Sequence, residues 1–183
     1  LNPGNKEIPF PLILTGPAGS EEYFRQIDAF IKLTLGEVAR QHYTIIIGDA
    51  AKVAREISAG LESVRNFRRV HADAFYFNWI LNIDHQFQLP FEATHENVAA
   101  LNLSHDQPLH LLAANLRRAF SAIVAGNVKA DGISQIEQHG PFELCAEPEI
   151  MQSLDALLHS FVQQQRMKVP GKAYTPCYSL KKQ

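Results

Sequence analysis

Along the first third of the chain, short continuous apolar segments are followed by segments in which apolar residues recur with helical spacing. The segments 11–17 (PLILTGP) and 43–49 (YTIIIGD) are short, apolar and rich in β-branched residues, which is typical of strands covered on both faces. After each of them, apolar residues recur every three or four positions, which predicts helices that follow Ser20 and Asp49 as capping residues. An order of strand, helix, strand, helix favours a parallel sheet with helical crossovers.

Two strands do not complete such a sheet. Each would leave a long apolar edge without a hydrogen-bonding neighbour. We therefore expect the remaining strands to lie upstream of Leu1, or in another copy or another chain.

Beyond about residue 65 the pattern changes. Residues 74–83 (AFYFNWILNI) alternate between two faces and predict a half-buried strand. Helices are expected after Asp106–Pro108, around Ile133 and Ile136 up to Gly140, and after Pro148, with strands at FELCA and AYTPCYSL. Pro176 would put the last strand at a sheet edge or at a bulge. This second part, residues 66–183, is interpreted as a small α+β domain.

Composition and charge exclude several classes of protein. Hydrophobic residues make up 46% of the 183 residues, charged residues 20%, and the net charge is −2. A binder of nucleic acid or of an anionic membrane would show a basic surface, so neither partner is expected. No apolar run is long enough to span a bilayer. Cys145 and Cys177 lie far apart and are interpreted as reduced thiols of a cytoplasmic protein.

The stretch TGPAGS follows a predicted strand and precedes a predicted helix. Ligands of open α/β sheets bind beyond the carboxyl ends of the strands, so Thr15 and Gly16 are candidates for lying near a substrate. The stretch lacks the glycine spacing and the terminal Lys-Ser/Thr of a P-loop. A plain turn is therefore the alternative interpretation.

No cofactor or metal is expected. His95 and Glu96 are adjacent in THEN, so they point in different directions on a helix and cannot share one ion. Thr94 as a helix cap accounts for the same stretch. The histidines show no metal-ligand spacing, and no recognisable nucleophile motif is present.

Two arginine doublets are candidates for binding an anion. Arg68 and Arg69 lie in NFRRV, between the two parts, and Arg117 and Arg118 lie in NLRRAF, with Lys129 after the same predicted helix. One interpretation is a solvated helix flank. The other is a multiply charged phosphate held by guanidinium groups, because such charge-assisted bonds contribute about 1.5–3 kcal/mol each.

Several stretches carry a resemblance to a known family. They are HYTIIIGDAAKVAR, NFRRVHADAFYFNW, PFEATHENVAALNL, LRRAFSAIVAGNVKADGI and EIMQSLDALLHSFVQQQRMKVPGKAYTPCY. Over essentially its whole length, the chain resembles the C-terminal part of the nucleotide 5′-monophosphate nucleosidases of the LOG family. Residues 1–65 resemble the end of the LOG Rossmann-like domain, and residues 66–183 resemble the extra domain of this subfamily, with a regulatory or oligomerisation role.

The resemblance implies hydrolysis of the N-glycosidic bond of a nucleoside monophosphate, giving ribose 5-phosphate and free base. In the family, the catalytic glutamate belongs to a glycine-rich motif that precedes the stretch equivalent to LNPGNKEIPF. No catalytic residue is therefore assigned to this chain. We expect the chain alone to be inactive unless it pairs with the upstream half.

The resemblance further implies a homotetramer activated by guanosine tetra- or pentaphosphate, (p)ppGpp. The residues proposed for this effector are Arg68, Arg69, Tyr76, Arg117 and Lys129. The rival hypotheses are a non-enzymatic subunit-assembly module, whose arginines pair with carboxylates across an interface, and a nucleotide-binding half-domain without regulation.

Overall fold

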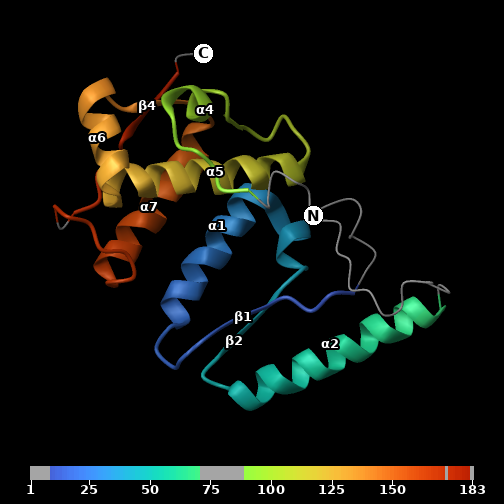
Figure 1. Cartoon of the computed structure of the whole chain (residues 1–183). Helices are drawn as coiled ribbons and strands as arrows, with labels where there is room; N and C mark the ends of the chain where they lie inside the picture. Colours follow the sequence, from blue (N-terminus) through green and yellow to red (C-terminus); the bar gives the residue numbers. More distant parts are fainter. Residues whose placement is uncertain (1–8, 71–88, 172, 182–183) are drawn as a thin grey trace. The chain divides into compact units, whose positions relative to one another are not determined.

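The computed structural model describes residues 9–70, 89–171 and 173–181 (Figure 1). Contacts between Cα atoms divide the chain into two compact units. Unit 1 comprises Leu1–Lys32 with Gly36–His85, and unit 2 comprises Leu33–Leu35 with Gln86–Gln183. The strand expected over 74–83, and with it Tyr76, lies outside the described residues.

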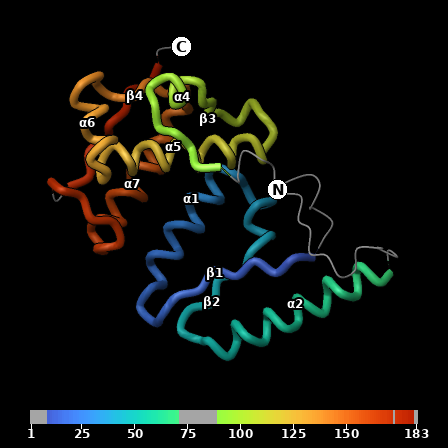
Figure 2. The backbone as a smooth tube through the Cα atoms, viewed as in Figure 1, coloured from blue at the N-terminus to red at the C-terminus, as the bar shows by residue number. Residues whose placement is uncertain are grey.

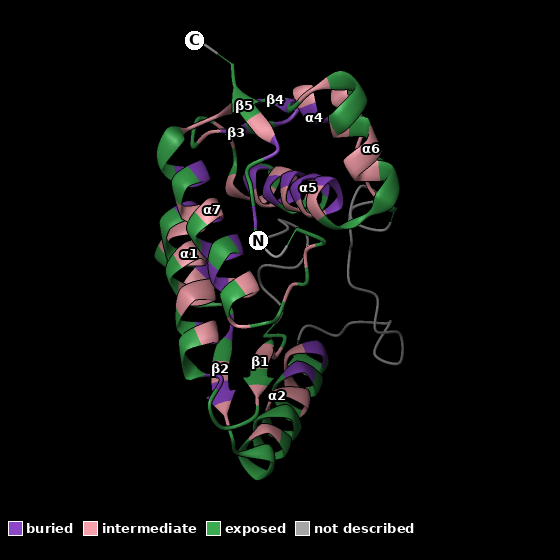
Figure 3. Ribbon diagram, turned by 90° about the vertical axis from the view of Figure 1, so that its left-hand side faces the viewer, coloured by how far each residue is buried: buried purple, intermediate pink, exposed green. Residues whose placement is uncertain are grey.

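Unit 1 has the predicted order of elements, with β1 at Ile13–Gly16, α1 at Glu21–Arg40, β2 at Thr44–Ile47 and α2 at Ala50–Val70. The two strands pair in parallel, with Ile13 opposite Thr44 and Gly16 opposite Ile47. The helices lie on opposite sides of the strand pair (Figures 1 and 3). This arrangement confirms the α/β prediction for the first part of the chain.

The two predicted helix caps of unit 1 differ. Asp49 caps α2, because its Oδ1 accepts a 2.7 Å hydrogen bond from the backbone N–H of Lys52. Ser20 makes no such bond; its hydroxyl donates to the Pro17 carbonyl instead. The prediction for Ser20 is wrong, since its ψ of 12° departs from the extended conformation that lets a cap side chain reach the helix.

A partly buried polar cluster ties α1 to the start of β2. Asp28 accepts a 2.7 Å hydrogen bond from the Tyr43 hydroxyl and forms a 2.5 Å ion pair with Nε of Arg40. The Arg40 guanidinium also lies over the Tyr43 ring, 5.2 Å from its centroid. Burial, and then the bond to Asp28, raise the pKa of Tyr43. The phenol therefore remains a donor throughout the physiological pH range.

Gly36 interrupts α1, and its replacement by alanine is expected to destabilise the protein. Its φ of 72° and ψ of −178° lie in a region that glycine alone enters without strain. Gly36→Ala should lower the free energy of unfolding by about 1–3 kcal/mol, measured by denaturant titration. If Gly36 had regular helical geometry, the same substitution would instead raise the free energy of unfolding by up to about 1 kcal/mol. A stabilised variant would therefore show that α1 is not interrupted at Gly36.

The described residues of unit 2 form four helices and three strands. They are α4 (His95–Ala99), β3 (Asn102–Leu103), α5 (Leu109–Val128), α6 (Ala130–His139), β4 (Phe142–Ala146), α7 (Pro148–Gln163) and β5 (Tyr178–Leu180). The strand order is β3-β4-β5, and both pairs are parallel. Helices therefore connect successive strands, as Figure 2 traces.

The parallel sheet corrects the α+β expectation for residues 66–183. The described strands of unit 2 are parallel with helical crossovers, which is an α/β arrangement. Two things hid this in the sequence: β3 is only two residues long, and strand direction is not encoded in an apolar pattern. Among the described strands, β5 lies at the edge of the sheet, with Pro176 just before it, which agrees with the first of the two alternatives for Pro176.

The core of unit 2 lies between this sheet and α5 and α7. Its largest fully buried side chains are Val98, Leu103, Leu112, Ile123, Phe142, Leu144, Ile150, Met151, Leu154 and Leu158. Gly126 and Gly132 bring α5 and α6 close together, because a Cβ on Gly132 would lie 2.3 Å from the carbonyl oxygen of Ala125. The sheet is thus covered by closely packed helices.

The division proposed at residue 65 lies inside α2, which continues to Val70. The boundary between the two units lies near residue 85 and not at residue 65. The assignment of a Rossmann-like end and a regulatory domain to the two sides stays a prediction.

Candidate functional site

The carboxyl ends of β1 and β2 meet at one edge of unit 1. The N–H of Gly48 donates a 2.9 Å hydrogen bond to the carbonyl of Gly16, so the turns after the two strands lie together. Thr15 is exposed at this edge. A Cβ on Gly16 would lie 2.5 Å from Oγ of Ser20 and 2.8 Å from the Phe24 ring. Gly16 is therefore needed for packing, whatever ligand lies near it.

The TGPAGS stretch forms a hydrogen-bonded turn. The N–H of Ser20 donates to the Pro17 carbonyl at 3.2 Å, and Gly19 has a φ of 91°, which favours glycine. The Ser20 hydroxyl is engaged with the same carbonyl and is buried. These contacts favour the plain-turn interpretation, and the nearness of Thr15 to a substrate stays a prediction.

The predicted arginines of unit 1 lie in the last turn of α2. Arg68 is buried, with 6% of its surface exposed. Arg69 is exposed and donates from Nη2 to Oδ1 of Asn66 at 2.5 Å. Of the two, only Arg69 presents its guanidinium at the surface of the described residues. Cations at a helix C-terminus are favoured by the helix dipole, which supplies a structural reason for both.

The predicted cations of unit 2 lie on α5, and they are not neighbours. Arg117 is exposed and donates from Nη2 to the Leu89 carbonyl at 3.5 Å. Lys129 follows the last helical residue, so it lies about 18 Å from Arg117 along the helix axis. The two backbone positions are thus more than three helical turns apart. Arg118 lies over the Phe91 ring, 5.9 Å from its centroid.

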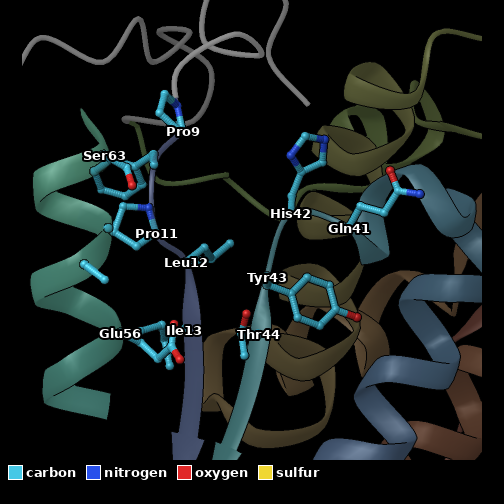
Figure 4. Close-up of a pocket in the computed structure, with 13 residues that line it drawn as sticks. Pro9, Pro11, Leu12, Ile13, Gln41, His42, Tyr43, Thr44, Glu56 and Ser63 are labelled. Carbon is cyan, nitrogen blue, oxygen red and sulfur yellow. The ribbon is translucent and has the colours of Figure 1, made fainter. Parts of the chain in front are cut away.

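A pocket of about 320 Å³ lies at the opposite, amino-terminal ends of β1 and β2 (Figure 4). It is lined by Pro9–Ile13, by Gln41–Thr44 and by the α2 residues Glu56, Ala59, Gly60 and Ser63. The Tyr43 ring turns away from it, toward Asp28 on α1. Neither Thr15 nor any of the predicted cations lines this pocket.

His95 has a structural role. Its Nε2 lies 2.9 Å from the Gly140 carbonyl, to which it donates, and its ring lies against Phe142 with centroids 4.8 Å apart. Thr94 caps α4 by accepting a 3.1 Å hydrogen bond from the N–H of Asn97, which confirms the capping prediction. Within the described residues, no group of three or more His, Cys, Asp or Glu could hold a metal ion.

One interacting pair in unit 2, His105 and Glu147, was not predicted from the sequence. Glu147 accepts two 2.6 Å hydrogen bonds from His105, at Oε1 from the backbone N–H and at Oε2 from Nδ1 of the ring. The bond to Glu147 raises the pKa of His105, and the bonds from His105 lower the pKa of Glu147. The pair joins the segment after β3 to the start of α7.

This pair predicts a pH dependence of stability. The raised pKa of His105 gives a contribution that is complete below the unfolded pKa of about 6.5 and lost as pH rises through the folded value. Both side chains are partly exposed, at 45% and 33%, so the effect should not exceed about 1 kcal/mol. His105→Gln should therefore cost more stability at pH 6 than at pH 8 in urea titrations. The exposed His42→Gln serves as control, and an equal cost of His105→Gln at both pH values would contradict the pairing.

The two cysteines are free. Cys177 is buried, and its Sγ lies 3.4 Å from Nδ2 of Asn127. Burial raises its pKa to about 11. In the described ranges, no helix has the length and apolar character needed to cross a membrane.

These observations define a mixed helix–strand protein with small parallel sheets, whose predicted anion-binding arginines lie on helices. A family model described as "Pyrimidine/purine nucleotide monophosphate nucleosidase, C-terminal" matches residues 61–181. The chain belongs to this family.

Curated relatives support the same placement. The pyrimidine/purine nucleotide 5′-monophosphate nucleosidases of Escherichia coli strain K12 and of Escherichia coli O157:H7 are each 54% identical to the chain over 180 residues. The match covers 98% of this chain and 40% of each relative. The chain thus spans about two fifths of the length of these relatives and corresponds to a C-terminal part, which confirms the resemblance found in the sequence.

Proposed function

We propose that the chain is the C-terminal part of a nucleosidase that hydrolyses the N-glycosidic bond of purine and pyrimidine nucleoside 5′-monophosphates in the cytoplasm. The observation that carries this proposal is the 54% identity over 98% of the chain with proteins named for that activity. The products would be ribose 5-phosphate and free base. No cofactor is part of the proposal.

The chemistry of such a reaction places limits on what this chain contributes. An oxocarbenium-like transition state needs a carboxylate near the anomeric carbon, and a phosphate is commonly held at a glycine-rich helix start. We assign neither group to the chain. Residues 1–65 would end a Rossmann-like LOG domain, in which Thr15 and Gly16 lie on the ligand side of the sheet. The upstream half of the protein would supply the catalytic carboxylate.

Activity measurements on two lengths of polypeptide test this proposal. The protein at the length encoded by its native gene and the 183-residue chain are each incubated with a purine and a pyrimidine nucleoside 5′-monophosphate, and free base is quantified by chromatography. Base release by the longer protein alone is expected. Base release by the 183-residue chain would show that the catalytic group is not confined to the upstream half. If neither polypeptide released base, the proposed activity itself would be wrong.

Residues 66–183 would serve as a regulatory and oligomerisation domain in a homotetramer, with (p)ppGpp as effector. Arg69 supports the proposal because its guanidinium is exposed at the end of α2, whereas Arg68 beside it is buried. Arg68, Tyr76, Arg117 and Lys129 remain in the proposed set. Since Arg117 and Lys129 lie far apart on α5, they would contact separate groups of the effector, or different effector molecules.

Charge reversal at Arg69 tests the effector proposal. Arg69→Glu should weaken binding of guanosine tetraphosphate at least tenfold by calorimetry, because one charge-assisted contact of about 1.5–3 kcal/mol is lost and a repulsive charge is introduced. Arg55→Glu is the matched control, since Arg55 is also exposed on α2 but about 21 Å away along the axis. Equal affinity of the wild type and Arg69→Glu would remove Arg69 from the site.

The same samples test the alternative hypothesis, that residues 66–183 form a subunit-assembly module. If the arginines served only subunit contact, guanosine tetraphosphate would not bind, and Arg69→Glu would lower the molecular mass measured by light scattering on dilution. Binding of the effector at unchanged mass would exclude that alternative.

A further inference from the structure

The break in α1 deprives two backbone carbonyls of their usual helical donors. In a continuous helix, the carbonyls of Leu33 and Thr34 would accept hydrogen bonds from the N–H groups four positions further along the chain. Gly36 lies between those donors and acceptors, and its φ of 72° and ψ of −178° are not helical. The two carbonyls therefore need donors from outside the helix.

His105 supplies such a donor within unit 2, to which Leu33–Leu35 also belongs. Besides its bond to Glu147, His105 forms hydrogen bonds with the backbone of Leu33 and of Thr34, and each of them raises its pKa. A hydrogen bond raises the pKa of a histidine when the ring donates it, so the acceptors are the two carbonyls. Thr34 has no exposed surface, so water cannot replace the ring at its carbonyl.

The segment that carries His105 is held in place by further contacts. The side-chain amide of Gln107 donates to the carbonyls of Asn102 and Ser104, at 2.7 and 3.0 Å. Glu147 accepts a 2.6 Å hydrogen bond from the backbone N–H of His105. A change in the charge of the ring therefore acts on the acceptors of the ring and not on the fold of its own segment.

The ring faces two kinds of acceptor, and only its protonated form has a donor for each. A protonated imidazole carries two N–H groups, and a neutral one carries one. Nδ1 lies 2.6 Å from Oε2 of Glu147, and hydrogen bonds to a charged acceptor are about twice as strong as those between neutral groups. When the ring loses a proton, the remaining N–H thus stays with Glu147, and the carbonyls of Leu33 and Thr34 lose their donor.

The charged groups around the ring favour its protonated form. Among them, Glu147 acts most strongly on the pKa of the ring. Lys32 and Glu37, which flank the break in α1, form an ion pair with each other. The other titratable residues of the segment after β3 and of the first turns of α5 and α7 are Asp106, His110 and Glu149. Asp106 and Glu149 are exposed, so solvent screens their charges.

We propose that His105 is a proton-operated latch for the break in α1. Its protonated ring holds the Leu33–Leu35 segment by donating to the carbonyls there and to Glu147, and loss of one proton releases the segment. The raised pKa of His105 places this release above the ordinary value of about 6.5, and the latch is closed below it. Because 45% of the side chain is exposed, the ring follows the pH of the surrounding solution. The latch does not depend on the proposed nucleosidase activity.

Amide hydrogen exchange of the protein at its native length tests the latch, after correction for the intrinsic effect of pH on exchange. Between pH 6 and pH 8.5, exchange of peptides that span the break in α1 should become about two- to tenfold faster, which corresponds to one hydrogen bond. Peptides from α6 (Ala130–His139) should change less. Exchange that does not depend on pH, or that rises equally in α6, would overturn the inference.

Three variants separate proton transfer from packing. His105→Gln keeps a neutral donor but cannot gain a charge, so its corrected exchange should not depend on pH. Glu147→Gln removes the charge that favours the protonated ring, so the midpoint should move to lower pH by about half a pH unit. His42→Gln is the matched control, since His42 is an exposed histidine just after α1, and it should keep the wild-type profile.

A wild-type profile in His105→Gln, an unmoved midpoint in Glu147→Gln or a lost profile in His42→Gln would each contradict the latch. If a variant failed to fold, the comparison of the wild-type peptides from α1 and α6 would still decide the question. Base release from nucleoside monophosphates by the same wild-type sample reports on the proposed function separately.

Discussion

Gly132→Ala is expected to destabilise the protein by about 3 kcal/mol or more. The new Cβ would lie 2.3 Å from the carbonyl oxygen and 2.5 Å from the carbonyl carbon of Ala125, and 3.0 Å from the backbone nitrogen of Gly126. All three are backbone atoms of α5, so no side-chain rotation can relieve the overlap. The two helices would have to separate, which loosens the core beside Phe142.

The measurement is a denaturant or thermal unfolding curve, with Gly171→Ala as control. Gly171 has no heavy atom within 4 Å of an added Cβ, so this variant should unfold close to the wild type. The ordinary preference of a helix for alanine over glycine, about 1 kcal/mol, acts in the opposite direction to the clash. A Gly132→Ala protein as stable as the wild type would therefore show that α5 and α6 do not approach this closely.

Asp155→Ala is the second large effect expected, a loss of about 2–4 kcal/mol from two hydrogen bonds to a charged acceptor. The hydroxyls of Tyr174 and Tyr178 donate to Oδ1 and Oδ2 of Asp155, each at 2.6 Å. Tyr174 is buried, with 3% of its surface exposed, so its hydroxyl would be left without an acceptor. Burial, and then the bond to Asp155, raise the pKa of both phenols; they thus stay donors at neutral pH.

Because both tyrosines belong to the C-terminal segment, the loss should be local as well as global. Peptides that contain β5 should exchange amide hydrogens faster in Asp155→Ala, while peptides from α5 change less. Glu137→Ala, an exposed acid on α6, is the control and should unfold like the wild type. Unchanged exchange in β5 would mean that the Asp155 contacts do not hold this strand.

The sequence predicted most elements of the described chain because their apolar faces are long or because a Pro, a Gly or a capping residue marks their ends. FELCA became β4 with the expected bounds, and Pro148 opens α7 as predicted. Helix α6 ends at Gly140, whose φ of 79° suits the stop signal. Periodicity and capping chemistry act between near neighbours, so one sequence is enough to detect them.

Features that depend on distant contacts were missed. Strand β3 is too short to show an alternating pattern, and the parallel order of the second sheet depends on pairing between segments some forty residues apart. His105 and Glu147 are 42 positions apart, and no spacing rule connects them. For the candidate effector residues, the sequence supplied the charge but not the placement. It could not show that Arg68 is buried while Arg69 is exposed.

The contrast between the two thiols makes the chain suitable for attaching a single spectroscopic probe. With a pKa of about 11, only about one Cys177 side chain in ten thousand is a thiolate at pH 7, and thiolates are the reactive form. Cys145 is only partly buried, so a maleimide dye should react there first. A fluorophore at the carboxyl-terminal part of β4 would then report on unit 2 without any change to the natural sequence.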